Sequence, residues 1–365
     1  MEYRLNMKIV FSIKALNHSG GTERVTAILS RELAERGHEV HVISFVGGDK
    51  DTFFEMDKRV KLHYLAPTKD KYPFPVRDIR RIVLMRRIYK EINPDVVLVV
   101  DAGRSFVNIP AARGYKTITW EHFNVGVNWH LGHRLSRKVA AKYSDLIVTL
   151  TAPDAESYKK HFGAKNAMCI YNPITIDSNN PSPLTEKVCL AIGRYSPQKN
   201  FMHLINAWSK TSARVKGWKL RIIGAGEEKK MLENRIKELD LSGSIEMLPP
   251  QKNVVEQYKN ASVYAMSSHH EGLPLVLIEA MAMGLPIVSY NCPTGPADIV
   301  SHEKTGLLIP YLNVDALAEG LDKVMLNETM REDFHKQALI EVEKFSVKTI
   351  VDKWEEVFKN LLENS

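Results

Sequence analysis

Short runs of β-branched and apolar residues alternate with helix-length amphipathic stretches, and this alternation limits the possible folds more than any other feature of the chain. Several of the runs are apolar on both parities, which is typical of parallel strands covered by helices on both faces. In the first half we expect strands at Lys8–Lys14, Glu39–Phe45, Val60–Leu65, Asp95–Val100, Lys116–His122 and Leu146–Leu150. Helices are expected between them, at Thr22–Arg36, Arg77–Ile92 and Trp129–Tyr143.

A segment rich in Asn, Ser and Pro, Tyr171–Lys187, interrupts the alternation and predicts a linker. Two successive series of strands and helices predict an α/β protein of two Rossmann-like, doubly wound domains. We place the first domain at 1–178 and the second at 179–345, followed by an amphipathic helix at 346–365. The second series of strands is expected at Val188–Gly193, Lys219–Gly224, Ile245–Leu248, Val263–Ser268, Pro286–Asn291 and Gly306–Pro310.

The cysteines and the hydropathy pattern bear on the compartment. Cys169, Cys189 and Cys292 are widely spaced and odd in number, so they fit neither a disulfide framework nor a zinc pattern. Each lies in an apolar run, and we expect buried free thiols and a reducing, cytoplasmic compartment. We expect no signal peptide and no membrane span, because no apolar stretch approaches the required length.

The net charge of +7 is distributed unevenly. Residues 1–180 hold 28 Lys and Arg against 19 Asp and Glu, whereas the remainder holds 22 against 24. The first half should therefore face an anionic partner, which leaves nucleic acid, a membrane surface and a phosphorylated substrate open. Two basic stretches contribute most, 77–90 with Arg80, Arg81, Arg86 and Arg87, and 133–142 with Arg134, Arg137, Lys138 and Lys142.

Basic amphipathic helices of this kind either present a solvated face or lie on anionic membrane surfaces. Our hypothesis is transient, peripheral docking on the inner face of the cell membrane. No RNA-binding motif with stacking aromatic residues is visible, so nucleic acid is not expected as a partner.

Ligands of open α/β sheets bind beyond the carboxyl ends of the strands, so two such domains predict a site in the cleft where they face each other. The richest strand end is Ser267–Gly284, where Pro274 is expected at the first helical position. The following helix would leave N–H groups near Leu275 free to bind a phosphate. Glu271 precedes this helix, and Glu279 lies within it, where a carboxylate can accept two hydrogen bonds from the vicinal diol of a ribose.

A second strand end, Gly193–Asn200, carries Arg194 and Lys199 on a loop that opens a helix. Two fixed cations and a helix N-terminus suit a diphosphate leaving group, because negative charge grows on it as the glycosidic bond breaks. The small residues of Asn291–Pro296 could place Thr294 and Gly295 beside a ligand.

In the first half, Gly20 and Gly21 follow the first strand and open a helix, so backbone there could approach a ligand closely. His122 closes another strand and is either a structural histidine or a substrate contact. We interpret Gly224–Ala225–Gly226 as a tight turn. A metal site is not expected, because the chain lacks an H-x-x-x-H pattern.

Taken together, these segments resemble the retaining glycosyltransferases of family 4, which have the GT-B fold. The resemblance covers nearly the whole chain, through SGGTERV, WEHFN, GRYSPQKN, IIGAGEE and the long block EGLPLVLIEAMAMGLPIVSYNCPTGPADIV. The chain is similar to bacterial enzymes that build capsule, O-antigen, lipopolysaccharide or lipid-linked oligosaccharides. The resemblance implies that the last helix crosses back to the first domain. It also implies that the first domain binds the acceptor and that the second binds the nucleotide sugar.

The resemblance also implies roles for individual residues. Arg194 and Lys199 would hold the donor diphosphate, Glu279 the ribose hydroxyls and Glu271 the hydroxyls of the transferred sugar. His122 would lie near the reacting sugar and the acceptor, while Gly20 and Gly21 would line the phosphate side. Backbone at Gly272, Leu273, Pro274 and Leu275 would contact sugar and phosphate, and the region Pro250–Val254 would meet the base.

The implied reaction is hexosyl transfer with retention and without a metal or other cofactor. The favoured donor is a UDP-sugar of the galactose, N-acetylgalactosamine, N-acetylglucosamine or glucose class, with a GDP-sugar as the alternative, and the acceptor would be a glycan or a polyprenyl-diphosphate-linked sugar. Protein groups would orient the reactants and stabilise charge. The alternative is a sugar-nucleotide 2-epimerase on the same architecture, which would need carboxylates placed to abstract a sugar proton.

Overall fold

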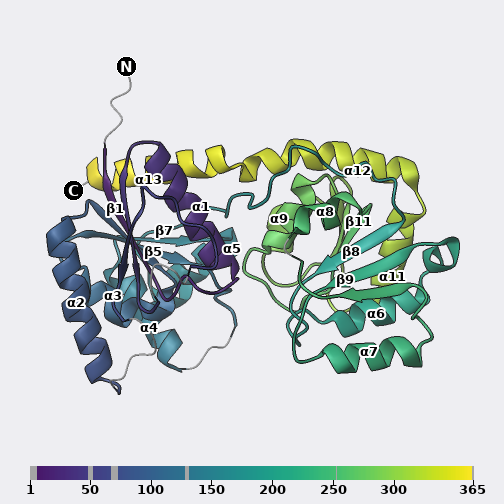
Figure 1. Ribbon diagram of the computed structural model, residues 1–365, viewed down its shortest axis with the longest axis horizontal. Coiled ribbons are helices and arrows are strands. Elements are labelled where there is room, and N and C mark those ends of the chain that lie inside the picture. Colours follow the sequence, from purple (N-terminus) through teal and green to yellow (C-terminus); the bar gives the residue numbers. More distant parts are fainter. Residues whose placement is uncertain (1–5, 48–51, 67–72, 128–130, 252, 364–365) are drawn as a thin grey trace. The chain divides into compact units, whose positions relative to one another are not determined.

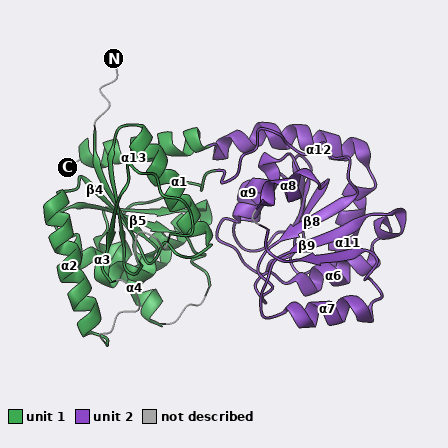
Figure 2. Cartoon of the chain, viewed as in Figure 1, with its two compact units in different colours: residues 1–173, 347–365 green, residues 174–346 purple. Residues whose placement is uncertain are grey.

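The computed structural model describes residues 6–47, 52–66, 73–127, 131–251 and 253–363. The chain forms two compact units, residues 1–173 with 347–365 and residues 174–346 (Figure 2). The division after Pro173 falls before the sequence-based boundary at 178. Ile174 already belongs to the second unit, where its N–H donates to the carbonyl oxygen of Phe345 at 2.8 Å.

The described strands of the first unit form one seven-stranded parallel sheet in the order β3-β2-β1-β4-β5-β6-β7. Figure 1 labels β1, β5 and β7 of this sheet. The central strand β4 is buried at every residue and β1 at all but its first, as expected where helices cover both faces. The bounds are β1 Lys8–Ile13, β2 Glu39–Ser44, β3 Lys61–Tyr64, β4 Val96–Val100, β5 Lys116–Glu121, β6 Leu146–Thr149 and β7 Ala167–Cys169.

Helices connect these strands, and a helix from the far end of the sequence joins them. That helix, α13 (Val347–Glu363), buries Trp354, whose ring lies edge-on to Trp120 of β5 with centroids 5.2 Å apart. Arg36, just after α1, donates to both Asp352 and Glu355 of α13. The other helices are α1 Gly21–Glu35, α2 Val76–Ile92, α3 Ser105–Ala111, α4 Leu131–Tyr143 and α5 Ala152–Ser157.

In the second unit the described strands form a six-stranded parallel sheet, ordered β10-β9-β8-β11-β12-β13. The strands are β8 Val188–Ile192, β9 Lys219–Ile223, β10 Ile245–Leu248, β11 Val263–Met266, β12 Ile287–Tyr290 and β13 Gly306–Ile309. The helices are α6 Phe201–Lys210, α7 Lys229–Glu238, α8 Val254–Lys259, α9 Leu275–Ala282, α10 Pro296–Ile299, α11 Val314–Met325 and α12 Glu328–Glu341. Both units are therefore Rossmann-like, as the sequence predicts.

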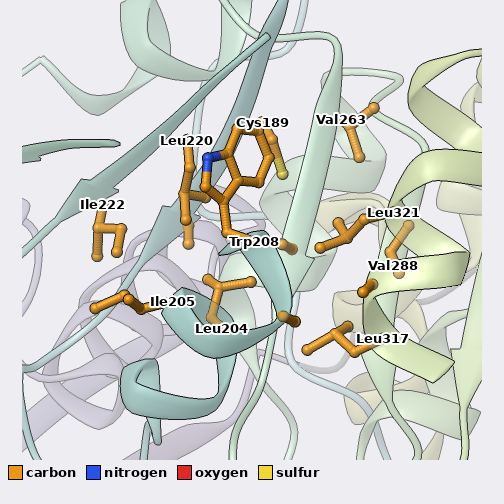
Figure 3. Packing of buried hydrophobic residues seen from close by; sticks show 14 of the residues in the cluster. Cys189, Leu204, Ile205, Trp208, Leu220, Ile222, Val263, Val288, Leu317 and Leu321 are labelled. Carbon is orange, nitrogen blue, oxygen red and sulfur yellow. The ribbon is translucent and has the colours of Figure 1, made fainter. Parts of the chain in front are cut away.

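The core of the second unit lies between its sheet and the helices α6 and α11. Figure 3 shows Trp208 of α6 lying against Cys189 and Leu220 of the sheet, all members of one buried apolar cluster. Burying an aromatic side chain of this size contributes several kcal/mol. This packing fixes α6, and with it the loop that precedes α6.

Some sequence-based expectations are wrong in detail. Arg81 and Arg137, expected within basic faces, are buried, and the Arg81 guanidinium stacks over the Phe45 ring at 5.3 Å. Cys169 is a free thiol but only half-buried, since it ends the edge strand β7, which the sequence did not predict. The expected helix start at Trp129 and part of the base region, at Lys252, lie outside the described residues. Within the described residues, none of the helices has both the length and the apolarity to span a membrane.

Candidate functional site

Each unit has a topological switch point, where the strand order reverses and the chain leaves neighbouring strands in opposite directions. In the second unit this point lies between β8 and β11, which pair in parallel. Ligands of doubly wound sheets bind beyond the carboxyl ends of the strands at such a point. The two loops that begin there, 193–200 and 267–274, are those that the sequence predicts to bind the donor.

The two loops are joined by an ion pair between Lys199 and Glu271. The Lys199 ammonium donates to Glu271 Oε1 at 2.6 Å, and the two side chains are 19% and 8% exposed. Two hydrogen bonds reinforce the junction, from Ser267 Oγ to the Lys199 carbonyl oxygen and from Gln198 Nε2 to the His270 carbonyl oxygen. A cation and a carboxylate are thus held side by side with neighbouring backbone fixed.

Arg194 is exposed at the start of the same loop. The loop packs tightly against the turn Gly224–Ala225–Gly226. The N–H of Tyr195, in the loop, donates to the carbonyl oxygen of Ala225 in the turn. A Cβ on Gly224 would lie 1.9 Å from the Gly193 carbonyl oxygen, and one on Gly226 would lie 2.2 Å from that of Tyr195. Gly224 and Gly226 are therefore required, because the two backbones approach closely. This close packing fixes the position of the loop that carries Arg194.

The turn before α9 is built from backbone as much as from side chains. The Thr294 hydroxyl donates to the Glu271 carbonyl oxygen at 2.5 Å. A Cβ on Gly295, whose φ is +95°, would lie 2.5 Å from the Gly272 carbonyl oxygen. Pro274 is the residue that precedes the helix, and α9 begins at Leu275 rather than at Pro274 as expected. Leu273 and Pro274 are buried while Gly272 and Leu275 are half-buried, so part of this turn is accessible.

Glu279 lies inside α9 and is buried, with 4% of its surface exposed. Thr175 donates to one carboxylate oxygen at 2.5 Å, and Tyr258 of α8 donates to the other at 2.7 Å. Thr175 falls in the segment interpreted as a linker, so sequence reasoning missed its part in orienting this carboxylate. No local pattern could have shown it, because the two residues are 104 positions apart.

In the first unit Gly20 immediately precedes α1 and Gly21 is its first residue. The carboxylate of Glu23 folds back over Gly20, and a Cβ on Gly20 would lie 2.3 Å from Glu23 Oε2. Burial raises the pKa of Glu23 against the lowering effect of its backbone hydrogen bond and nearby cations. Gly20 and Gly21 thus lie between β1 and α1, as expected, and the Glu23 side chain covers Gly20.

His122 follows β5 directly, and its ring packs on the Trp120 indole with centroids 4.2 Å apart. The side chain is buried, and Nε2 has no hydrogen-bond partner among the described residues. Burial lowers the pKa of His122 to about 4, only partly opposed by the charge of Asp101. The imidazole is therefore neutral near pH 7 and can accept or donate a hydrogen bond.

Asp101, whose charge acts on His122, is a residue that the sequence did not indicate. It follows the apolar strand β4 with a φ of +77°, accepts the Gly103 N–H at 2.8 Å and pairs with His133 Nε2 at 3.5 Å. Burial opposes ionisation, but these two interactions hold the pKa of Asp101 below its usual value. The sequence feature that could have indicated Asp101 is its position directly after the continuous apolar strand Val96–Val100. Among the described residues, no cluster of three or more His, Cys, Asp or Glu side chains is arranged to hold a metal ion.

Models of known protein families match both halves of the chain. The model described as glycosyl transferases group 1 matches residues 174–340, and that described as Glycosyltransferase Family 4 matches residues 19–178. An uncharacterised glycosyltransferase of Haemophilus influenzae is 32% identical, over 95% of this chain and 98% of its own length. The protein belongs to the family-4 glycosyltransferases and has the GT-B fold.

Two further proteins are similar over nearly their whole length. An alpha-1,4-N-acetyl-D-galactosaminyltransferase of Campylobacter jejuni, whose name gives a PP-undecaprenol-linked glycan as its acceptor, is 28% identical over 95% of this chain and 97% of its own. The crystal structure of HepE from Anabaena, in complex with UDP, superposes with a TM-score of 0.82 at 18% identity, covering 97% of this chain and all of that one. These relatives favour a transferase over the epimerase considered from the sequence.

Proposed function

We propose that this enzyme is a retaining hexosyltransferase that moves a hexose or N-acetylhexosamine from a UDP-sugar to a glycan or lipid-linked acceptor in bacterial surface polysaccharide synthesis. The observation that carries the proposal is the Lys199–Glu271 pair at the switch point of the second unit, with the buried Glu279 on the helix that follows. A UDP donor is supported by the UDP bound to HepE, and a lipid-linked acceptor by the name of the Campylobacter enzyme.

In the proposed reaction, the bond between the anomeric carbon and the donor diphosphate breaks, and a bond to the acceptor oxygen forms on the same face. The departing diphosphate takes the acceptor's proton. Arg194 and Lys199 would stabilise the charge that grows on the diphosphate. Glu271 would hold the transferred sugar and Glu279 the ribose, while Leu273 and the backbone around it contact sugar and phosphate. Gly20, Gly21 and His122 of the first unit would contact substrate, with His122 on the acceptor.

The test is a matrix of UDP-glucose, UDP-galactose, UDP-N-acetylglucosamine and UDP-N-acetylgalactosamine against a short prenyl-diphosphate-linked N-acetylhexosamine. A product with the α-anomeric configuration of the donor supports the proposal, and an inverted product contradicts it. A thermal-shift panel with UDP-, GDP- and ADP-sugars identifies the base, because a ligand bound only by the folded state raises Tm. We further propose that transfer needs no metal, so EDTA should leave the rate unchanged.

Peripheral membrane docking is part of the proposal, and we propose helix α2 as the docking surface. On α2 the side chains of Val76, Ile79 and Val83 are more than half exposed, and Arg80, Arg87 and Lys90 are exposed at matching helical spacing. Apolar residues flanked by cations suit the boundary of an anionic bilayer. The buried Arg81 takes no part, and Arg86 instead donates to the carbonyl oxygens of Ala111 and Arg113.

Co-sedimentation with vesicles containing phosphatidylglycerol tests this docking at low and high salt. Ile79→Glu with Val83→Glu should reduce binding by at least about tenfold, because each change removes apolar burial and adds a repelled charge. Ile340→Glu is the control, since Ile340 is also more than half exposed, on α12 of the other unit. Equal binding of all three proteins would contradict a docking role for α2.

A further inference from the structure

The side chain of Arg137 on α4 is only 3% exposed, although arginine is rarely buried. Its guanidinium contacts the segment that directly follows His122. Nη2 donates to the carbonyl oxygens of Phe123 and Asn124 at 3.4 and 3.2 Å, and Nη1 donates to that of Val125 at 3.2 Å. One planar group thus binds three successive carbonyl oxygens.

Glu121, the last residue of β5, completes the arrangement. Its Oε2 accepts from Arg137 Nε at 2.8 Å and from the Tyr158 hydroxyl at 2.7 Å, and its Oε1 accepts from the Phe123 N–H at 3.1 Å. The Glu121 side chain is 1% exposed. The far end of the segment is held as well, since the Val125 N–H donates to Asp154 Oδ1 at 2.9 Å. His122 is therefore flanked on both sides by backbone whose position the ion pair sets.

Stability alone is a poor explanation for this buried ion pair. Removing two charges from water costs several kcal/mol each, and well-packed apolar residues of similar volume often serve stability equally well. What the guanidinium supplies is a rigid, planar set of donors with fixed directions. The imidazole of His122 packs on Trp120, and its Nε2 has no hydrogen-bond partner among the described residues, so the ring depends on packing and on the backbone for its orientation.

The held segment also borders open space. Val125 and Gly126 line a cavity of about 290 Å³ together with Arg134, Arg137 and His161. A shift of this backbone by an ångström would change both the direction of His122 and the shape of this cavity. Displacements of that size can lower a rate by about a hundredfold when they misplace a reacting partner.

We propose that Arg137, together with Glu121, is a positioning residue for the transfer reaction, which holds the backbone from Phe123 to Val125 so that His122 is presented to the acceptor. The inference rests on the proposed function in one respect, the contact of His122 with the acceptor. Arg137 itself need not touch substrate.

The test compares Arg137→Lys with the wild-type enzyme. Lysine keeps a cation for Glu121 but cannot reach three carbonyl oxygens. We expect kcat for transfer to the prenyl-diphosphate-linked N-acetylhexosamine to fall at least about tenfold while KM for the UDP-sugar stays within about twofold. The control is Arg36→Lys, which alters another ion-paired guanidinium, one that contacts α13 instead. Its kcat should not change.

A substrate-free readout accompanies the kinetics. The ¹³Cε1–¹H NMR signal of His122, assigned by its loss in His122→Gln, should move in Arg137→Lys and titrate closer to the ordinary histidine range. Tyr158→Phe removes only one neutral donor to Glu121 and should show a smaller change of the same kind, which keeps the test decisive if Arg137→Lys fails to fold. An unmoved His122 signal in a folded variant overturns the inference.

The two hypotheses fail in different ways. If His122→Gln retains the wild-type kcat, the proposed acceptor contact of His122 is wrong. If His122→Gln is slow and Arg137→Lys is as fast as the wild-type enzyme, the acceptor contact stands and the positioning role is overturned.

Discussion

Lys199 and Glu271 form an ion pair at 2.6 Å although 72 residues separate them in the sequence. The strand order brings them together, because β8 and β11 are neighbours at the switch point and each residue lies on the loop that follows one of these strands. The ion pair links the two loops, so a change at either residue should affect both catalysis and local stability.

Lys199→Ala should lower transfer by orders of magnitude, and so should Arg194→Ala, because each removes a cation proposed to stabilise the departing diphosphate. Their effects on stability should differ. Loss of Lys199 leaves the buried Glu271 carboxylate without this partner and should cost about 1–3 kcal/mol, whereas Arg194 is exposed. Initial rates and urea unfolding of both variants check this. Wild-type rates in both would falsify the proposed diphosphate site.

Glu279→Gln should raise KM for the donor by about tenfold and change kcat little, because a ribose contact is made equally in the ground state and the transition state. The amide keeps the volume of the carboxylate but cannot accept from both Thr175 and Tyr258 at its two ends. Steady-state kinetics with varied UDP-sugar provide the measurement. Glu238→Gln on exposed α7 serves as control, and an unchanged KM in Glu279→Gln would exclude the ribose role.

His122 predicts an acid-dependent loss of stability. Its pKa is about 4 in the folded protein and 6.5 when unperturbed, so between these values the unfolded chain binds the additional proton. Stability should therefore be unaffected by His122 above pH 6.5 and should fall by about 3 kcal/mol from this residue as the pH drops to 4. Urea unfolding of wild type and His122→Phe at several pH values isolates the effect by difference. Parallel curves would show that His122 titrates normally.

Trp354→Ala should destabilise the first unit by about 3–5 kcal/mol, because it opens a cavity beside Trp120 in a fully buried position. Lys353→Ala, the exposed neighbour on the same helix, should leave the unfolding midpoint unchanged. Circular dichroism during urea unfolding measures both. A Trp354→Ala midpoint equal to that of Lys353→Ala would mean that α13 contributes little to this unit.

The fold was largely predictable because fully buried parallel strands are continuous apolar runs that the sequence displays directly. Val96–Val100 is buried throughout and begins one residue after the predicted start at Asp95, and Val263–Met266, also buried throughout, ends two residues before the predicted Ser268. The edge strand Ala167–Cys169 was missed because it is three residues long and not fully buried. Glu271, Lys199 and Glu279 could be selected because they lie in or beside the loops that end strands.

The partners of these residues could not be predicted, since hydrogen bonds join positions that no local pattern relates. Arg137 lies in the sequence among Arg134, Lys138 and Lys142 and was assigned to a basic face for that reason, yet helical spacing places it with Ser136, Ala140 and Ala141 on the buried side. A charge on the buried side of a helix predicts a buried counter-charge, but which carboxylate supplies it depends on the fold.

The first unit is discontinuous, since its last helix, Val347–Glu363, follows the whole of the second unit in the sequence. During synthesis the second unit can therefore complete its core while the first still lacks Trp354, Phe358 and the partners of Arg36. Because Trp354 of this last helix packs edge-on against Trp120, the first unit cannot complete its packing until the whole of the second unit has been synthesised.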